Sequence, residues 1–309
     1  MDSSSKKAIL AALIGNSLIS VIKFVAAGWT GSAAMFSEGI HSLVDTGNQG
    51  LLLYGLQRSK RAATKEFPFG FGKEVYFWSF VVAMLIFLLG GVLSIYLGWI
   101  SLGADIPIQD MHINYLVIVS ALIFEGLALK VAIKEFNLSR GEKPIIESIL
   151  SGKDPSIFVV VLEDCAAILG LVIAMLGLFI CQLTGDQVWD GIASISIGLV
   201  LLLTSVLLAV ESKKLLISES AEQELEDQIR DIILGHEKIG RVNEIVTLHM
   251  GSEFIVAAIS VDFSSQFNSD GIEKIVAKIN TQIKKADSRV RRVFVEAESF
   301  SDHAKEINT

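Results

Sequence analysis

The chain is poor in proline and cysteine, and it has no excess of positive charge. Its 309 residues include four prolines and two cysteines, and 34 acidic residues against 26 basic ones give a net charge of −8. Nucleic-acid binding needs a basic face, so the negative charge argues against a nucleic-acid partner. Cys165 and Cys181 both lie in apolar surroundings, which is more typical of core packing than of a disulfide framework.

Signatures of enzymes and of ATP use are also missing. The sequence contains no P-loop, and no pairing of a nucleophile with a base is apparent. We therefore expect a protein that is not an enzyme and that does not use ATP. The long apolar segments contain no internal proline, whereas carriers of organic solutes are typically built with broken helices.

Long apolar runs are what the sequence has in abundance. Hydrophobic residues make up 51% of the chain, and the mean hydropathy is +0.55. About 20 apolar residues in a helix, rising about 1.5 Å each, cross a hydrocarbon core of about 30 Å. The sequence therefore predicts an α-helical membrane protein with six transmembrane helices, at about 7–28, 32–57, 74–101, 112–136, 156–184 and 187–211.

The links between these helices differ in charge. Three links, at 29–31, 102–111 and 185–186, contain no Lys or Arg. The other two links are basic, with Arg58, Lys60, Arg61, Lys65 and Lys73 in one and Lys134, Arg140, Lys143 and Lys153 in the other. Basic links stay on the cytoplasmic side of a membrane. We expect a multi-pass protein of the bacterial inner (plasma) membrane with both termini in the cytoplasm.

The composition changes at about residue 215, where the spanning runs stop. We expect a transport domain at 1–214 and a cytosolic domain for dimerisation or regulation at 215–309. Helical spacing and β-branched runs predict the elements of the second domain: helices at Ala221–Leu234 and Gly271–Lys285, and strands at Arg241–His249, Glu253–Phe263 and Arg289–Glu296. The α-β-β-α-β order predicts a small α+β domain of ferredoxin-like type.

Ionisable residues interrupt the apolar helices, and five of them gather in two of the helices. The second predicted helix carries Glu38, His41 and Asp45, and the fifth carries Glu163 and Asp164. An ionisable group in hydrocarbon costs about 2.5–3.5 kcal/mol on insertion scales, so each needs a reason. His41 and Asp45 are four residues apart on one helical face, and Glu38 joins the same side. An imidazole and carboxylates from two helices, with water or a fourth side chain, can bind a divalent metal ion.

Other polar residues in these segments have a structural interpretation. Asn16, Asn48 and Gln49 are interpreted as hydrogen-bonding links between helices, and Lys23 and Glu125 as an intramembrane or interfacial charge pair, or as snorkelling side chains. The His-x-x-x-Asp pair with a carboxylate in a later helix is instead more typical of an ion pathway than of a scaffold.

Several motifs resemble the cation diffusion facilitator family. They are Asn16, Lys23, Thr30-Gly31-Ser32, the segment Ser37–Asp45, and Glu125-Gly126 with Lys130. The segment Val160–Asp164 is most similar to the subgroup of the mitochondrial zinc transporter nine. The six helices and the α-β-β-α-β tail agree, so the resemblance covers essentially the whole chain.

The resemblance implies a homodimer in the bilayer that exchanges zinc or a related divalent cation for protons. It places the transport site at His41, Asp45 and Asp164. The fourth ligand of the family falls at Val160, which cannot bind metal, so Glu163 or a water would fill that place. Glu38 is a weaker candidate. Zinc is then the transported substrate rather than a cofactor.

Two other functional classes stay open at this point. One is a proton- or sodium-coupled carrier of another solute, and the other is a membrane-anchored metal sensor that binds without flux. The polar residues of the tail do not decide between them. They are interpreted as solvated residues rather than as a second metal site: His236, Glu244, His249, Glu296 and Glu298.

Overall fold

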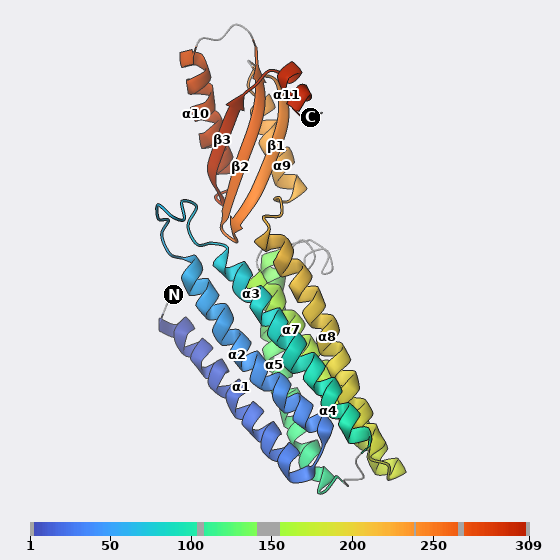
Figure 1. The fold of residues 1–309 in the computed structure, drawn as a ribbon. Coiled ribbons are helices and arrows are strands. Elements are labelled where there is room, and N and C mark those ends of the chain that lie inside the picture. Colours follow the sequence, from blue (N-terminus) through green and yellow to red (C-terminus); the bar gives the residue numbers. More distant parts are fainter. Residues whose placement is uncertain (1–2, 104–107, 141–154, 238, 265–268, 307–309) are drawn as a thin grey trace. The chain divides into compact units, whose positions relative to one another are not determined.

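The computed structural model describes residues 3–103, 108–140, 155–237, 239–264 and 269–306 (Figure 1). Lys143 and Lys153, which entered the reasoning on the links, lie outside these residues. The chain divides into two compact units, Met1–Gln57 with Val75–Lys213 and Arg58–Glu74 with Lys214–Thr309. The first is a bundle of long helices and the second contains the sheet, and each is described by itself.

The first unit consists of long helices. Their bounds are α1 Ser3–Thr30, α2 Ala33–Ser59, α3 Glu74–Leu85, the π-helix η1 Ile86–Val92, α4 Leu93–Leu102, α5 Met111–Arg140, α7 Pro155–Thr184 and α8 Val188–Leu216. Because α3, η1 and α4 follow one another without a break, they form one span. Figure 1 shows the helices running side by side as a bundle.

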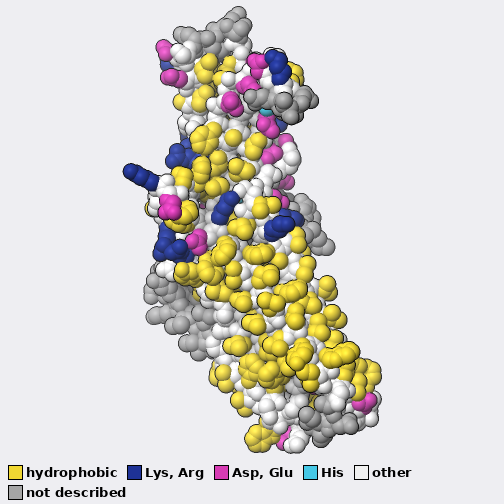
Figure 2. Space-filling model, viewed as in Figure 1, with side chains coloured by type: hydrophobic (Ala, Val, Ile, Leu, Met, Phe, Trp, Pro, Cys, Tyr) yellow, Lys and Arg dark blue, Asp and Glu magenta, His cyan; other side chains and the backbone are white. Residues whose placement is uncertain are grey.

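Among the described residues, four spans are long and apolar enough to cross a membrane: Glu74–Leu102, Met111–Asn137, Phe158–Thr184 and Val188–Leu216. They confirm the four predicted helices at 74–101, 112–136, 156–184 and 187–211, the last of which extends five residues further. Helix α2 has 27 residues, but its polar face lowers its hydropathy. Large hydrophobic side chains point outward from the bundle, as Figure 2 shows on the face in view. The chain is thus a multi-pass helical membrane protein.

Glycines bring the third span and α8 into backbone contact. A Cβ atom built on Gly98 would lie 2.7 Å from the carbonyl oxygen of Gly191. One built on Gly198 would lie 2.8 Å from that of Gly91, which belongs to η1. In a membrane, where burial of apolar surface gives no drive for association, small residues let helices gain packing energy by close approach. The two helices are therefore held by backbone proximity.

The links predicted at 29–31 and 185–186 each contain a glycine with positive φ. Gly31 has φ +79° between α1 and α2, and Gly185 has φ +71° between α7 and α8. Only glycine adopts such backbone conformations without steric cost.

The cysteines were both expected in the core. Cys181 is buried there, but Cys165 is exposed, because it lies on the outward side of α7.

The second unit contains the predicted α-β-β-α-β order. Its elements are α9 Gln223–Leu234, β1 Ile239–Gly251, β2 Phe254–Phe263, α10 Ser269–Ala286 and β3 Val290–Ala297, followed by α11 Phe300–Glu306, which sequence patterns did not predict. The sheet has the order β1-β2-β3; β1 pairs with β2 antiparallel, and β2 pairs with β3 parallel. Apolar residues of α9 and α10 pack on it and form one core.

A half-buried arginine ties the ends of this unit together. Arg289 donates hydrogen bonds to Asp287 at 2.8 Å and to Glu222 at 3.3 Å. Partial burial by itself would raise the pKa of both acids, but the guanidinium outweighs it, so each pKa lies below its ordinary value. The hydrogen bond to Asp287 in turn raises the pKa of Arg289. The network therefore stabilises the folded tail when both acids are ionised.

Candidate functional site

The polar face of α2 is buried inside the first unit. Ser32 caps the helix by accepting a hydrogen bond from the backbone N–H of Met35 at 3.1 Å. An α-helix has 3.6 residues per turn, so positions i, i+4 and i+7 lie on one face. In α2 these positions are His41, Asp45 and Asn48. All three side chains are buried, with 1%, 9% and 0% of their surface exposed. The helix therefore presents a polar stripe to the interior of the bundle.

His41 and Asp45 meet on this stripe. The His41 Nδ1 atom lies 3.4 Å from Asp45 Oδ1. Within the part of the chain that the structure describes, both ring nitrogens of His41 and this oxygen have no hydrogen-bond partner. Buried polar atoms are nearly always satisfied, so three unsatisfied atoms together call for an explanation. Two ligand atoms on a tetrahedral zinc ion, each at about 2.1 Å from it, lie about 3.4 Å apart.

Helix α7 contributes two carboxylates near this pair. Glu163 is buried and accepts a hydrogen bond from Asn48 Nδ2 at 2.8 Å. Asp164, the next residue, is half-buried on a neighbouring side of the helix. Both acids act electrostatically on Asp45. The structure thus brings the α7 acids toward the α2 stripe, with Glu163 tied to it directly and Asp164 not.

A cavity of about 570 Å³ opens beside Asp164. It lies between α1, α2, α5 and α7 and is lined by Asn16, Gln49, Val160 and Asp164 among others. Val160 is one turn before Asp164 and faces the same cavity, so the position expected for a fourth ligand is an apolar wall. Asn16 and Gln49, interpreted from sequence as links between helices, line the cavity instead.

The metal-binding residues predicted from sequence do not close around one point. Among the described residues, no group of three His, Cys, Asp or Glu side chains is arranged to hold a metal ion. His41 and Asp45 form a ready pair, and the acids of α7 stand near it. The ligand set of His41, Asp45 and Asp164, with Glu163 as a substitute, therefore stays a prediction.

Glu38 is engaged elsewhere. Lys23 Nζ of α1 donates to Glu38 Oε2 at 2.9 Å and to Ser42 Oγ at 2.7 Å, and both charged side chains are fully buried. Gly170 of α7 packs so closely on Glu38 Oε1 that a Cβ there would collide with it. Glu38 is thus the counter-ion of Lys23 through Oε2, while its Oε1 atom has no hydrogen-bond partner among the described residues, so its role as a weaker ligand candidate stays a prediction. The intramembrane charge pair expected for Lys23 exists, but its direct partner is Glu38, while Glu125 acts on it only electrostatically.

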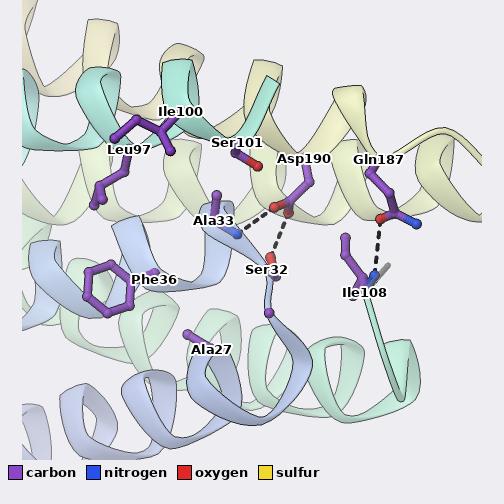
Figure 3. Close-up of a pocket in the computed structure, with 11 residues that line it drawn as sticks. Ala27, Ser32, Ala33, Phe36, Leu97, Ile100, Ser101, Ile108, Gln187 and Asp190 are labelled. Carbon is purple, nitrogen blue, oxygen red and sulfur yellow. Dashed lines mark hydrogen bonds between the residues drawn. The ribbon is translucent and has the colours of Figure 1, made fainter. Parts of the chain in front are cut away.

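Sequence reasoning missed Asp190 of α8, which caps the start of α2. Figure 3 shows its carboxylate turned toward the link between α1 and α2. It accepts hydrogen bonds from Ser32 Oγ at 2.6 Å and from the backbone N–H groups of Ala33 and Ala34. A negative charge at a helix N-terminus is also favoured by the helix dipole. The only sequence signal was an acid in the first turn of an otherwise apolar helix.

The tail bears out the expectation of solvated polar residues only in part: Glu244 and Glu296 are exposed, but His249 is not. His249 is fully buried near the end of β1, and His303 of α11 is buried with Nδ1 2.8 Å from Glu298 Oε2. Glu298 also accepts a hydrogen bond from Ser260 Oγ at 2.9 Å. His303 belongs to α11 itself, whereas His249 lies near the β1–β2 hairpin, where its backbone N–H donates to the carbonyl oxygen of Glu219 at 3.4 Å.

Residues 9–217 match the family model for the cation efflux transmembrane domain, which covers more than half of the chain. The chain belongs to the cation diffusion facilitator family. Members of this family are transporters rather than enzymes, which confirms the expectation drawn from the missing enzyme signatures.

Family relatives come from animals, plants and bacteria. The mitochondrial proton-coupled zinc antiporter SLC30A9 of Mus musculus is 31% identical over 84% of this chain and 46% of its own length. The metal tolerance protein C4 of Arabidopsis thaliana is 34% identical over 72% of this chain and 49% of its own. The manganese efflux system protein MneP of Bacillus subtilis is 22% identical over 96% of each chain. The chain thus spans about half the length of the SLC30A9 relatives.

Proposed function

We propose that this protein moves a divalent cation, zinc first of all, out of the cytosol in exchange for protons. The observation that carries the proposal is the pair of His41 and Asp45, whose buried Nδ1 and Oδ1 atoms lie 3.4 Å apart without hydrogen-bond partners in the described chain. Relatives named as a zinc antiporter and as a manganese efflux protein support the choice of a divalent metal. His41, Asp45 and Asp164 are the proposed ligands, with Glu163 as a substitute.

We propose that α1 and α2 also cross the membrane, which gives six transmembrane helices. The basic link at 58–73 then lies in the cytoplasm with both termini and with a ferredoxin-like tail. We place the protein in a bacterial inner (plasma) membrane as a homodimer. In this orientation the cavity beside Asp164 gives a cation a route from the cytosol.

Proton exchange follows from the chemistry of the donors. A metal ion binds an imidazole nitrogen or a carboxylate oxygen only through a lone pair that a proton could otherwise occupy. Loading the site from the cytosol therefore releases protons. After the helices move and the site faces outward, protons displace the cation. An imidazole suits this exchange because its ordinary pKa lies near neutral pH.

The test is zinc uptake into proteoliposomes under an imposed pH gradient, followed with a fluorescent zinc indicator. We expect zinc flux and opposite proton flux from the unmodified protein. His41→Ala and Asp45→Ala should each abolish the flux, while the control His112→Ala, at an exposed position of α5, should leave it unchanged.

Each alternative gives a different result in the same assay. Zinc binding without flux would favour a membrane-anchored sensor. Proton flux that depends on another solute and not on metal would favour a solute carrier. Normal zinc flux in both site variants would place the site elsewhere.

A further inference from the structure

Asn48 carries a fourth unsatisfied atom on the polar stripe of α2. Its side chain is fully buried, and its Oδ1 atom has no hydrogen-bond partner in the described part of the chain. It lies seven residues after His41 and three after Asp45, which places it on the same face. The unsatisfied acceptors of His41, Asp45 and Asn48 thus follow one another along one line of a single helix.

A hydrogen bond to Glu163 occupies one end of the Asn48 amide. Asn48 Nδ2 donates to Glu163 Oε1 at 2.8 Å. In this orientation the NH₂ group faces the carboxyl group of Glu163. The carbonyl oxygen is then left on the other side of the amide, where no donor from the described chain meets it.

We propose that the carbonyl oxygen of Asn48 is a ligand of the transported cation and supplies the donor that Val160 cannot. The inference rests on the proposed function. It makes one amide bifunctional, since the NH₂ group holds the α7 acid against α2 while the carbonyl group binds the ion. A cation would satisfy the carbonyl oxygen together with the lone pairs of His41 and Asp45.

This assignment also bears on the class of cation. With Asn48, the α2 stripe offers one nitrogen and two oxygen donors, and the α7 acid adds more oxygen. Imidazole suits zinc, whereas carboxylate and carbonyl oxygens suit manganese. Asn48 therefore adds an oxygen ligand to the site. A site with this oxygen should bind manganese better, relative to zinc, than a site with an imidazole at the same position.

Two substitutions separate the ligand role from a purely structural one. Asn48→Leu keeps the volume but removes both ends of the amide. Asn48→Asp keeps an oxygen for the cation but removes the donor and sets a like charge against Glu163. If residue 48 is a ligand, the Asp variant should therefore keep far more of the metal affinity than the Leu variant. If residue 48 is only a structural link, the Asp variant should keep no more affinity than the Leu variant. Gln182→Leu, an exposed amide near the end of α7, is the matched control.

The measurement is the dissociation constant of zinc and of manganese for the purified full-length protein, with proteoliposome flux alongside. We expect Asn48→Leu to weaken zinc binding about 10–100-fold, the range found when partners of metal ligands are removed. Manganese binding should weaken more than zinc binding. Asn48→Asp should bind both ions within a few-fold of the unmodified protein.

Unchanged zinc affinity in Asn48→Leu would overturn the assignment, as would equal losses in the Leu and Asp variants. If Asn48→Leu does not fold, the visible absorption bands of bound Co²⁺ are compared between the unmodified protein and Asn48→Asp. A shift of the bands supports the ligand role, and identical bands overturn it. Failure of the unmodified protein to bind or move any metal would instead refute the proposed function.

Discussion

Because Lys23 and Glu38 form a buried ion pair, we predict that replacing both residues destabilises the protein less than replacing Lys23 alone. Lys23→Met leaves Glu38 as an uncompensated charge, because the 2.9 Å ion pair is lost together with the 2.7 Å hydrogen bond to Ser42. Breaking a buried pair from one side costs about 3–5 kcal/mol. Replacing both partners with apolar residues of similar volume is often neutral or stabilising by about 1–4 kcal/mol.

We therefore expect Lys23→Met to lower the free energy of unfolding by about 3 kcal/mol or more. The double variant Lys23→Met, Glu38→Leu should recover most of that loss. The free energy is measured by titrating sodium dodecyl sulfate into mixed micelles, with helicity as the signal. The double variant should also keep zinc flux, since Glu38 is paired with Lys23 and the proposed ligands His41, Asp45 and Asp164 are unchanged.

Two results would refute this reasoning. If the double variant is as unstable as Lys23→Met, the stability comes from packing and not from charge compensation. If the double variant is stable but cannot move zinc, Glu38 takes part in transport. Lys130→Met, which changes a lysine of α5 outside this network, is the control for loss of a positive charge.

Three further predictions concern the helix cap, the tail and the close helix pair. Asp190→Ala should destabilise the protein by about 2–4 kcal/mol, because a cap and buried N–H partners are lost together, and Asp190→Asn by less; the same detergent titration measures both. Arg289→Met should lower the stability of the tail by about 1–3 kcal/mol at pH 7. The pKa of Glu222 and of Asp287 is depressed, so the stabilisation by Arg289 is present above about pH 4.5 and is lost as the pH falls through the folded-state pKa values. The thermal unfolding temperatures of the unmodified protein and of Arg289→Met should therefore converge on acidification. A difference that stays constant with pH would contradict the assignment. Gly98→Val should separate α4 from α8 and so lower the rate of disulfide cross-linking between cysteines introduced into the two helices. An unchanged rate would contradict this prediction.

Much of the fold follows from local patterns in the sequence. Four spans and the five main elements of the tail could be predicted, because each depends on apolar periodicity within one segment. The π-helix η1 and helix α11 could not, since nothing in the residues of either segment departs from an ordinary pattern. The bounds of α8 extended beyond its apolar run because Lys213 and Lys214 continue the helix after the hydrophobic residues end.

The candidate site was predictable only along one helix. The spacing of His41 and Asp45 follows from helical geometry, and the structure brings them within 3.4 Å. The partners of Glu38 and Asp190 were not predictable, because Lys23 lies on another helix and Ser32 lies in the link between α1 and α2. Such pairings depend on how the helices pack, which local patterns do not specify.

The central claim is that His41 and Asp45 bind the transported cation. X-ray absorption at the zinc edge, on purified protein loaded with one zinc per chain, tests it most directly. We predict a shell of nitrogen and oxygen ligands at about 2.0–2.2 Å with the scattering of one imidazole, and the loss of that imidazole signal in His41→Ala. An imidazole signal that persists in His41→Ala, or a sulfur shell at about 2.3 Å, would contradict the account.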